Sequence, residues 1–222
     1  MSAMSKNIAQ IREEYLLASL NEEDAGNNPV SFFKQWFEEA EQSQVTEVNA
    51  MTLATVDASN KPHARTVLLK GIDDDDTFVF FTNYNSHKGQ QIASNQQVAI
   101  LFFWKELQRQ VRIEGVIAKV SDAASDAYFL SRPIGSQIGA IASPQSQIIA
   151  SRAVLEDAVN KINNQLITNS ITIQRPLHWG GYKVHPTLIE FWQGRASRLH
   201  DRVVFERLTK DTDEWKKYRI AP

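Results

Sequence analysis

The chain has 222 residues, of which 42% are hydrophobic, and it carries 24 Lys and Arg residues against 26 Asp and Glu residues. A chain of this length buries roughly 70% of its unfolded surface and folds without covalent staples, so we expect one compact domain with appendages. The formal net charge of -2 argues against nucleic acid or an anionic membrane as the main partner. Cysteine is absent, which excludes disulfides, thiolate nucleophiles and Cys-ligated metal centres.

Targeting and metal-binding patterns are also missing from the sequence. The five histidines are dispersed and form no H-E-x-x-H motif, so we expect no metal site. The first residues have neither an apolar signal region nor an Arg-rich transit pattern, and the densest apolar run, Val98–Trp104, is too short to span a bilayer. We therefore expect a soluble cytoplasmic protein.

The N-terminal part predicts two helices separated by a polar linker. Apolar residues recur at helical spacing over Ser5–Leu20, and the linker Asn21–Asn28 follows. Asn28 and Pro29 have the pattern of an N-cap and a first-turn proline, and Phe33, Trp36, Phe37 and Ala40 form the apolar stripe of the second helix. We expect residues 1–28 to be a helix and linker, and 29–222 to be a single domain.

From Ala50 the hydrophobic period changes to two, which is typical of strands. The connectors between the first strands are too short for crossover helices, so we expect antiparallel pairing in a barrel or sandwich. The fold class is thus mainly β with flanking helices. The predicted strands are Met51–Val56, His63–Lys70, Thr77–Thr82, Gln97–Trp104, Arg109–Val120, Tyr182–Trp192, Val203–Leu208 and Trp215–Ile220.

Three further helices are predicted over Ser86–Asn95, Asp122–Ser131 and Ser151–Leu166. In the last of these we expect an inward-facing row made of Val154, Leu155, Ala158 and Ile162. The segment between the last two, Pro133–Ser151, has no charged residue and is rich in Ser, Gln and Gly. This composition suits neither a packed helix nor a disordered tail, so we expect the segment to pack against another surface.

Common catalytic motifs are absent. No G-x-S-x-G elbow, G-x-G-x-x-G fingerprint or Walker sequence occurs, which argues against a serine hydrolase, a Rossmann enzyme and a P-loop ATPase. What remains is a set of cations and amides near strand ends and helix starts, which would suit small phosphorylated ligands.

Two of these clusters lie in the first half of the chain. Arg65 and Lys70 are at the two ends of a predicted strand, although solvated basic ends on an edge strand explain them better on sequence alone. The segment Phe81–Lys88 runs from a strand into a helix start that carries a lysine, a typical anion site. An ordinary serine N-cap with a surface lysine explains it equally well.

Two more clusters follow. Gln110 and Arg112 share one strand face, for which a polar outward face is the simpler interpretation. Tyr128 and Arg132 are one helical turn apart with Ser136 just beyond, which would grip a phosphate, although Arg132 and Pro133 also fit a simple helix end.

The segment Ile189–Arg202 is the most informative one. Three arginines, a histidine and a tryptophan crowd the end of a predicted strand. A solvated face does not explain them, because the aromatic side chains favour burial and the cations do not. Fixed cations beside an aromatic surface suit a planar anionic ligand.

Together these segments carry a resemblance to a known family. The motifs RTVLLK, FFTNYNSHK, RQVRIEG, YFLSRPIGSQIG, SPQS, WGGY and EFWQGRASRLHDR occur in the order and spacing of the pyridoxine/pyridoxamine 5'-phosphate oxidases. The match runs from about Arg12 to Pro222, nearly the whole chain. The resemblance implies an antiparallel FMN-binding split β-barrel that acts as a homodimer, with the flavin between subunits.

The resemblance also implies roles for particular residues. The FMN contacts would be Arg65, Thr66, Val67, Leu68, Leu69, Lys70, Phe81, Thr82, His87, Lys88, Gln110, Gln145, Ser146, Trp192 and Arg202. The substrate contacts would be Lys70, Tyr128, Arg132 and Ser136 on the phosphate and Arg198, Leu199 and His200 beside the ring, with Arg198 and His200 as the catalytic pair. Arg12, Glu13, Glu14 and Tyr15 resemble a segment that closes over the substrate.

The implied reaction oxidises pyridoxine 5'-phosphate or pyridoxamine 5'-phosphate to pyridoxal 5'-phosphate, while oxygen is reduced to hydrogen peroxide. Two positions depart from the family pattern: His87 stands where arginine is common, and Ala140–Ala142 stand where a tryptophan is common. The alternatives are another split-barrel flavin reductase, or a flavin or pyridoxal-phosphate carrier without turnover.

Overall fold

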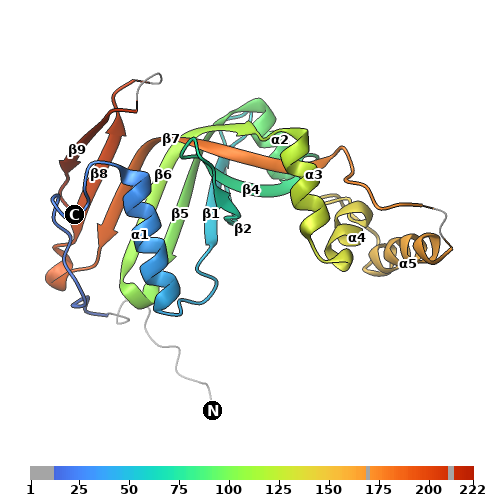
Figure 1. The fold of residues 1–222 in the computed structure, drawn as a ribbon, viewed down its shortest axis with the longest axis horizontal. Helices are drawn as coiled ribbons and strands as arrows, with labels where there is room; N and C mark the ends of the chain where they lie inside the picture. The colour runs from blue at the N-terminus through green and yellow to red at the C-terminus, as the bar shows by residue number, and fades with distance from the viewer. Residues whose placement is uncertain (1–12, 169–170, 210–212) are drawn as a thin grey trace, which may run out of the picture. The chain divides into compact units, whose positions relative to one another are not determined.

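The computed structural model describes residues 13–168, 171–209 and 213–222 (Figure 1). Its helices and strands follow the chain in the order α1 Pro29–Gln42, β1 Ala50–Val56, β2 Pro62–Leu68, β3 Gly71–Ile72, β4 Phe78–Asn83, α2 His87–Ser94, β5 Gln97–Trp104, η2 Lys105–Leu107, β6 Arg109–Lys119, α3 Asp122–Ser131, α4 Ile134–Ala142, α5 Ala153–Ile167, β7 Trp179–Gln193, η3 Ala196–Arg198, β8 Asp201–Arg207 and β9 Trp215–Arg219.

The strands of the described chain belong to a nine-stranded sheet with the order β2-β1-β5-β6-β7-β4-β3, to which β8 is added on β7 and β9 on β8. The pairs β1–β2, β3–β4, β4–β7, β7–β8 and β8–β9 are antiparallel. The predicted class, an antiparallel sheet with flanking helices, is therefore confirmed, because short polar turns join the early strands as their spacing requires.

By its internal contacts the chain divides into two compact units. Unit 1 comprises residues 1–48, 101–112 and 188–222, and unit 2 comprises 49–100 and 113–187. The strands β5, β6 and β7 contribute residues to both units.

The core of unit 1 lies under helix α1. Asn28 caps this helix, because its side chain accepts the amides of Val30 and Ser31 at 2.9 Å, as the sequence predicts. Phe33 packs against Phe102 of β5 with ring centroids 5.0 Å apart, and Phe32 packs against Phe191 of β7 at 4.6 Å. One apolar helix stripe thus covers the ends of two strands.

The core of unit 2 is formed by the alternating residues of its strands. Leu53, Phe78, Phe80, Ile100 and Val184 are fully buried, as are Ile113 and Phe129. Strand β4 is buried along most of both faces, whereas β1 and β6 alternate between buried and half-buried positions. This alternation is the signal from which the strands could be predicted.

Two helix predictions are corrected by the structure. Residues 13–20 contain no helix, while residues 5–12 of the predicted N-terminal helix lie outside the described residues. The amides of Leu16 and Leu17 bond to the side chain of Gln108 instead of to a helical turn. Conversely, α4 is a helix within the segment Pro133–Ser151, where its composition argued against one.

The reason for α4 is visible in its packing. Ile138 is buried, and the side-chain amide of Gln137 donates to the carbonyls of Leu130 and Arg132 at 3.2 and 2.8 Å. A buried, satisfied glutamine replaces the apolar residue expected on a packed helix face.

The predicted inward row of α5 is wrong in part. No residue of α5 is buried, and Val154 is 43% exposed. Leu155, Ala158 and Ile162 are only half-buried. None of the helices in the described ranges has both the length and the apolar composition that crossing a bilayer requires.

Candidate functional site

Unit 2 contains a cavity of about 740 Å³, which we call the phosphate cavity. Many of the sequence-predicted residues line it: Thr66, Val67, Leu68, Lys70, Phe81, Thr82, Lys88, Tyr128, Arg132, Ser136 and Gln145, together with Asn83, Pro133, Gly139, Ala140, Ser143 and Trp179. Three of these residues are cationic and none is acidic. The volume suits a small organic ligand, and the charge favours an anionic one.

Arg132 carries an unsatisfied donor in this cavity. It follows the last residue of α3, and its guanidinium carbon lies 4.7 Å from the ring centroid of Trp179. Its Nη1 atom is buried and has no hydrogen-bond partner within the described chain. Burial lowers the pKa of Arg132, and the nearby Tyr128 opposes this effect. A buried guanidinium nitrogen without an acceptor is costly, so this atom is placed to bind an anion.

Aromatic rings form one wall of the phosphate cavity. Phe81 and Tyr128 stack with centroids 3.8 Å apart, and Phe81 and Trp179 stack at 5.6 Å. The guanidinium of Arg132 lies over the Trp179 ring of this stack, 4.7 Å from its centroid. This cation–π contact favours one orientation of the planar guanidinium in the cavity.

A second cavity of unit 2, about 850 Å³ in volume, shares Lys88 and Gln145 with the first. It contains the predicted residues Arg65, His87 and Ser146, as well as the unpredicted pair Asp57 and His63. The Nε2 atom of His63 lies 2.9 Å from the Asp57 carboxylate. The hydrogen bond from His63 lowers the pKa of Asp57, so the acid in this cavity has its own partner.

Lys88, like Gln145, lines both cavities. Its Nζ atom donates to Gln145 Oε1 at 3.0 Å and to Thr82 Oγ1 at 3.1 Å. Burial and then the charge of Arg65 lower its pKa. The turn before α2 sets this position: a Cβ atom at Gly89 would lie 2.1 Å from the Tyr84 carbonyl oxygen, so only glycine allows the close approach. Lys88 is thus half-buried, unlike the surface lysine of the simpler interpretation.

The Arg65 side chain is held by neutral oxygen acceptors of β1 and α2. Its guanidinium donates to the Leu53 carbonyl at 3.0 Å, to Thr55 Oγ1 at 2.6 Å and to Gln91 Oε1 at 2.9 Å. Burial lowers its pKa. Because neutral oxygens accept these bonds, the positive charge is not cancelled by a carboxylate, and Arg65 is not the solvated edge residue that the strand pattern alone favoured.

Unit 1 holds the predicted ring-facing residues in an aromatic cluster. The rings of Trp192 and His200 are 4.6 Å apart, and Tyr15 lies 5.8 Å from each of them. The Arg195 amide donates to His200 Nδ1 at 3.1 Å. Burial, followed by the charge of Arg198, lowers the pKa of His200, while Asp201 opposes the shift. Because Nδ1 accepts the Arg195 amide, a neutral His200 carries its proton on Nε2.

Arg202, a predicted flavin contact, is held by the carboxylate of Glu190, a residue for which the sequence analysis predicted no role. Arg202 Nε donates to Glu190 Oε1 at 2.7 Å, and Arg112 Nη2 donates to Glu190 Oε2 at 2.6 Å. The Glu190 side chain is 2% exposed. Its position between two buried apolar residues of β7, Ile189 and Phe191, is the sequence signal that it needs a cationic partner.

The remaining predicted residues have varied positions. Leu69 is buried and lines neither cavity. Arg198 and Leu199 are exposed, and Gln110 is half-buried. Glu13 forms an ion pair with Lys105 at 3.6 Å, and the Glu14 carbonyl accepts a hydrogen bond from Gln108. Arg12 lies outside the described residues. The predicted set therefore divides between the two units, with the phosphate residues together in unit 2 and the ring-facing residues in unit 1.

Comparisons with known proteins agree with these motifs. Residues 37–166 match the family model described as pyridoxamine 5'-phosphate oxidase, and residues 179–222 match the pyridoxine 5'-phosphate oxidase C-terminal dimerisation region. A pyridoxine/pyridoxamine 5'-phosphate oxidase of Leptospira interrogans is 57% identical over 99% of this chain and 100% of its own. One from Cupriavidus necator is 52% identical over 97% of this chain and 99% of its own.

Solved structures show the same architecture. PhzG from Burkholderia lata, in complex with tetrahydrophenazine-1-carboxylic acid, superposes with a TM-score of 0.84 at 25% identity. The superposition covers 94% of this chain and 100% of the PhzG chain. A pyridoxamine 5'-phosphate oxidase-related FMN-binding protein of Nostoc punctiforme gives 0.69 at 19% identity, over 89% of this chain and 99% of its own, and this likeness shows the fold alone. The predicted split β-barrel class is confirmed. The chain belongs to the pyridoxine/pyridoxamine 5'-phosphate oxidase family.

Proposed function

We propose that the protein is an FMN-dependent oxidase that converts pyridoxine 5'-phosphate and pyridoxamine 5'-phosphate to pyridoxal 5'-phosphate. The alcohol and oxygen give the aldehyde and hydrogen peroxide. The amine, oxygen and water give the aldehyde, ammonia and hydrogen peroxide. Relatives at 57% and 52% identity that carry this name support the proposal.

The observation that carries the proposal is the unpartnered Nη1 atom of Arg132 in the phosphate cavity. Lys70, Tyr128 and Ser136 line the same cavity. Two cations and two hydroxyls supply the charge and the hydrogen bonds that a phosphate monoester requires. A substrate phosphate held there would provide binding energy away from the reacting carbon.

The residues of unit 2 also fit FMN. The two cavities share Lys88 and Gln145, and Arg65 brings an uncancelled charge into the second one. The FMN contacts in unit 2 would be Arg65 through Lys70, Phe81, Thr82, His87, Lys88, Gln145 and Ser146. The resemblance to the family adds Gln110, Trp192 and Arg202 as further FMN contacts. When bound, FMN supplies the two-electron acceptor, and the protein positions substrate against it.

His200 and Arg198 would act at the substrate ring. The bond from the Arg195 amide to Nδ1 leaves the His200 Nε2 proton available to a ring substituent. Arg198 has no ion pair in the described part of the chain, so its charge is free to face an electron-rich pyridine. Their task is to orient the ring and to stabilise developing charge.

The related PhzG structure raises the alternative of another flavin-dependent reaction. Its 25% identity to this chain is well below the 57% of the named oxidase, and the phosphate cavity favours a phosphorylated substrate. A carrier without turnover would not need His200 and Arg198 beside the ring.

The test is to purify the protein with its flavin and add pyridoxine 5'-phosphate without oxygen. We expect the yellow flavin absorbance to bleach, and to return on admitting air with equal amounts of hydrogen peroxide and pyridoxal 5'-phosphate formed. Pyridoxine without the phosphate is the control and should bleach the flavin far more slowly. Bound flavin that stays yellow with both phosphorylated substrates would overturn the proposal.

A further inference from the structure

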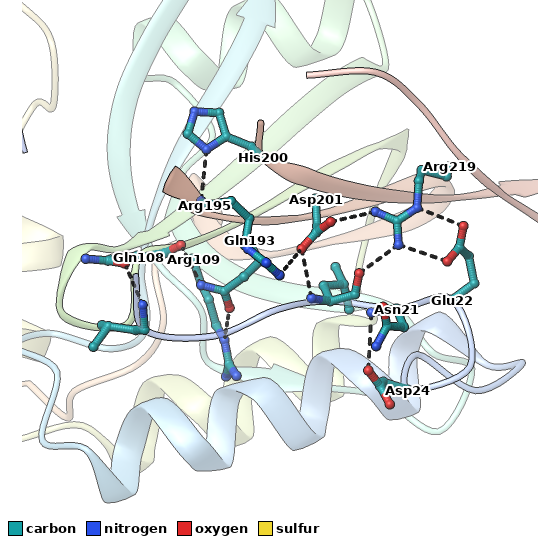
Figure 2. A network of polar contacts seen from close by, with 12 residues as sticks. Asn21, Glu22, Asp24, Gln108, Arg109, Gln193, Arg195, His200, Asp201 and Arg219 are labelled. Atoms are coloured by element: carbon teal, nitrogen blue, oxygen red, sulfur yellow. Dashed lines mark hydrogen bonds and ion pairs between the residues drawn. The ribbon is translucent and has the colours of Figure 1, made fainter. Parts of the chain in front are cut away.

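The segment Glu14–Leu20, which we call the strap, is fixed to the rest of unit 1 by side chains from distant parts of the sequence. Gln108 Oε1 accepts the amides of Leu16 and Leu17 at 3.0 and 3.3 Å. Further along, the Leu20 amide donates to Asp201 Oδ2 at 3.1 Å. Figure 2 shows the strap running past Gln108 and Asp201. Side chains thus satisfy three backbone donors of the strap, in place of the helical bonds that the sequence predicts.

Asp201 accepts hydrogen bonds on both carboxylate oxygens. Besides the Leu20 amide, Oδ2 accepts from Arg195 Nη1 at 3.1 Å, and Oδ1 accepts from Arg219 Nη1 at 2.7 Å. In Figure 2 the Arg219 guanidinium lies between Asp201 and Glu22, whose carboxylate it also binds, at 2.9 Å. The Asp201 side chain is 18% exposed, so these contacts are only partly screened by water.

The Arg195 residue connects this carboxylate to the imidazole. Its guanidinium binds Asp201, while its own amide donates to His200 Nδ1 at 3.1 Å. This amide hydrogen bond requires an unprotonated Nδ1 and so places the proton of a neutral His200 on Nε2. Asp201 thus bonds to the side chain of the same residue whose backbone amide bonds to His200 Nδ1.

The strap reaches the same imidazole from its other end. The Tyr15 ring lies 5.8 Å from the His200 ring, and it rests on the backbone of Gly194, where a Cβ atom would meet the Tyr15 ring at 2.7 Å. One carboxylate therefore anchors both the loop that orients His200 and the segment that carries Tyr15.

We propose that Asp201 is a positioning residue for the reaction: its carboxylate sets the orientation and tautomer of His200 through Arg195 and holds the strap that packs Tyr15 against that imidazole. The inference rests on the proposed function, because it assumes that His200 faces the substrate.

The charges around His200 within unit 1 define what a substitution would change. Arg198 lowers the pKa of His200 and Asp201 raises it, while Tyr15 and Trp192 contribute uncharged rings. Asp201 accepts bonds from three donors, the Leu20 amide and the guanidinium groups of Arg195 and Arg219. The side chain of Asp201→Asn has one acceptor oxygen and one donor NH2 group. At least one of the three bonds is therefore lost, and the NH2 group faces another donor. The variant also removes the negative charge that favours protonated His200.

The experiment compares flavin-loaded Asp201→Asn, Asp201→Glu and Glu22→Gln. Glu22→Gln is the matched control, because it removes the same charge from a partner of Arg219 but touches neither Arg195 nor the Leu20 amide. We expect Asp201→Asn to lower kcat between about tenfold and a hundredfold with unchanged flavin content. Asp201→Glu should recover most of this loss, and Glu22→Gln should lie near wild type.

Nitrogen NMR of labelled histidine gives a readout independent of turnover. The His200 signals, identified by their loss in His200→Gln, should report protonation at Nε2 in wild type and in Glu22→Gln, and a mixture of tautomers with a lower pKa in Asp201→Asn. If Asp201→Asn does not fold, Arg195→Gln, which removes the same link, takes its place.

The outcomes separate the two proposals. A wild-type protein that does not oxidise either substrate contradicts the proposed function, and the tautomer measurement still tests the hydrogen-bond chain. An active wild type with equal kcat and an equal His200 tautomer in Asp201→Asn and Glu22→Gln would overturn the positioning role.

Discussion

The carboxylate of Glu190 bonds to Arg202 at 2.7 Å while its side chain is 2% exposed. Burial raises the pKa of Glu190, but hydrogen bonds from Arg202 and Arg112 outweigh this effect, so its pKa is lowered. The pair connects β7 to β8 at the residue proposed to contact the flavin, so we expect its removal to affect both stability and cofactor binding.

We expect Glu190→Gln to destabilise the fold at neutral pH by about 2 kcal/mol or more, because it leaves two arginines without their charged partner. Since the pKa is lower in the folded state, the contribution of Glu190 is complete above its unfolded pKa and is lost as the pH falls through the folded value. Urea unfolding from neutral to acidic pH should show the variant and wild type converging. A constant difference would contradict the ion-pair assignment.

Arg132 gives a separate prediction for substrate affinity. Arg132→Ala should raise KM for pyridoxine 5'-phosphate by a factor that corresponds to about 1.5 to 3 kcal/mol, the value of a charged hydrogen bond. Arg132→Lys should recover little, because a lysine neither stacks on Trp179 as a plane nor offers two parallel donors. Steady-state kinetics with both substrates checks this, and full recovery by lysine would mean that net charge alone is required.

The ring-facing pair should behave differently from Arg132. His200→Ala and Arg198→Ala are expected to reduce kcat while the flavin content stays near that of wild type, because their proposed contacts are with the substrate. Flavin absorbance per protein and single-turnover bleaching provide the two readouts. Near-normal kcat in both variants would show that the reacting face has been assigned wrongly.

His87 provides a separate prediction for the cofactor. It is exposed at the first turn of α2 and lines the second cavity beside Lys88. An arginine at this position would bring a permanent charge and two parallel donors to the FMN phosphate. His87→Arg should therefore bind FMN about tenfold more tightly, which flavin fluorescence titration of the two apoproteins measures. Equal affinities would show that His87 does not contact the phosphate.

The match to a dimerisation region predicts that flavin binding requires a homodimer. Sedimentation of the flavin-loaded protein should give a dimer, and dilution or an interface substitution that yields monomers should release FMN. A monomer that retains one tightly bound flavin would contradict this.

Local patterns predicted most of the secondary structure. The cap formed by Asn28 and the period-two segments predicted α1 and the strands, because each signal is contained in a few neighbouring residues. The helix prediction for the strap was wrong for the opposite reason. The Leu16 amide binds Gln108, which lies more than ninety positions further along the chain. A local pattern carries no information about such a partner.

The candidate site shows the same division. Motifs predicted the cations of the phosphate cavity, but not the groups that orient them. Two examples are the contact of Trp179 with Arg132 and the bond of Asp201 with Arg195. Only the folded chain shows these contacts, because each pair joins segments that are separate in sequence or in secondary structure. A charged residue within a buried strand, such as Glu190, is the exception that the pattern could have revealed.

The loop that carries Arg198 has an unusual backbone. Ser197 and Arg198 are consecutive residues with φ values of 55° and 62°, a region that side chains other than glycine occupy at a cost of about 1 kcal/mol or more each. The loop that carries Arg198 therefore holds a strained backbone, and a glycine at either position would relieve that strain. Selection for thermal stability alone would therefore tend to remove the very residues that the proposed chemistry needs, so activity and robustness are opposed at this loop.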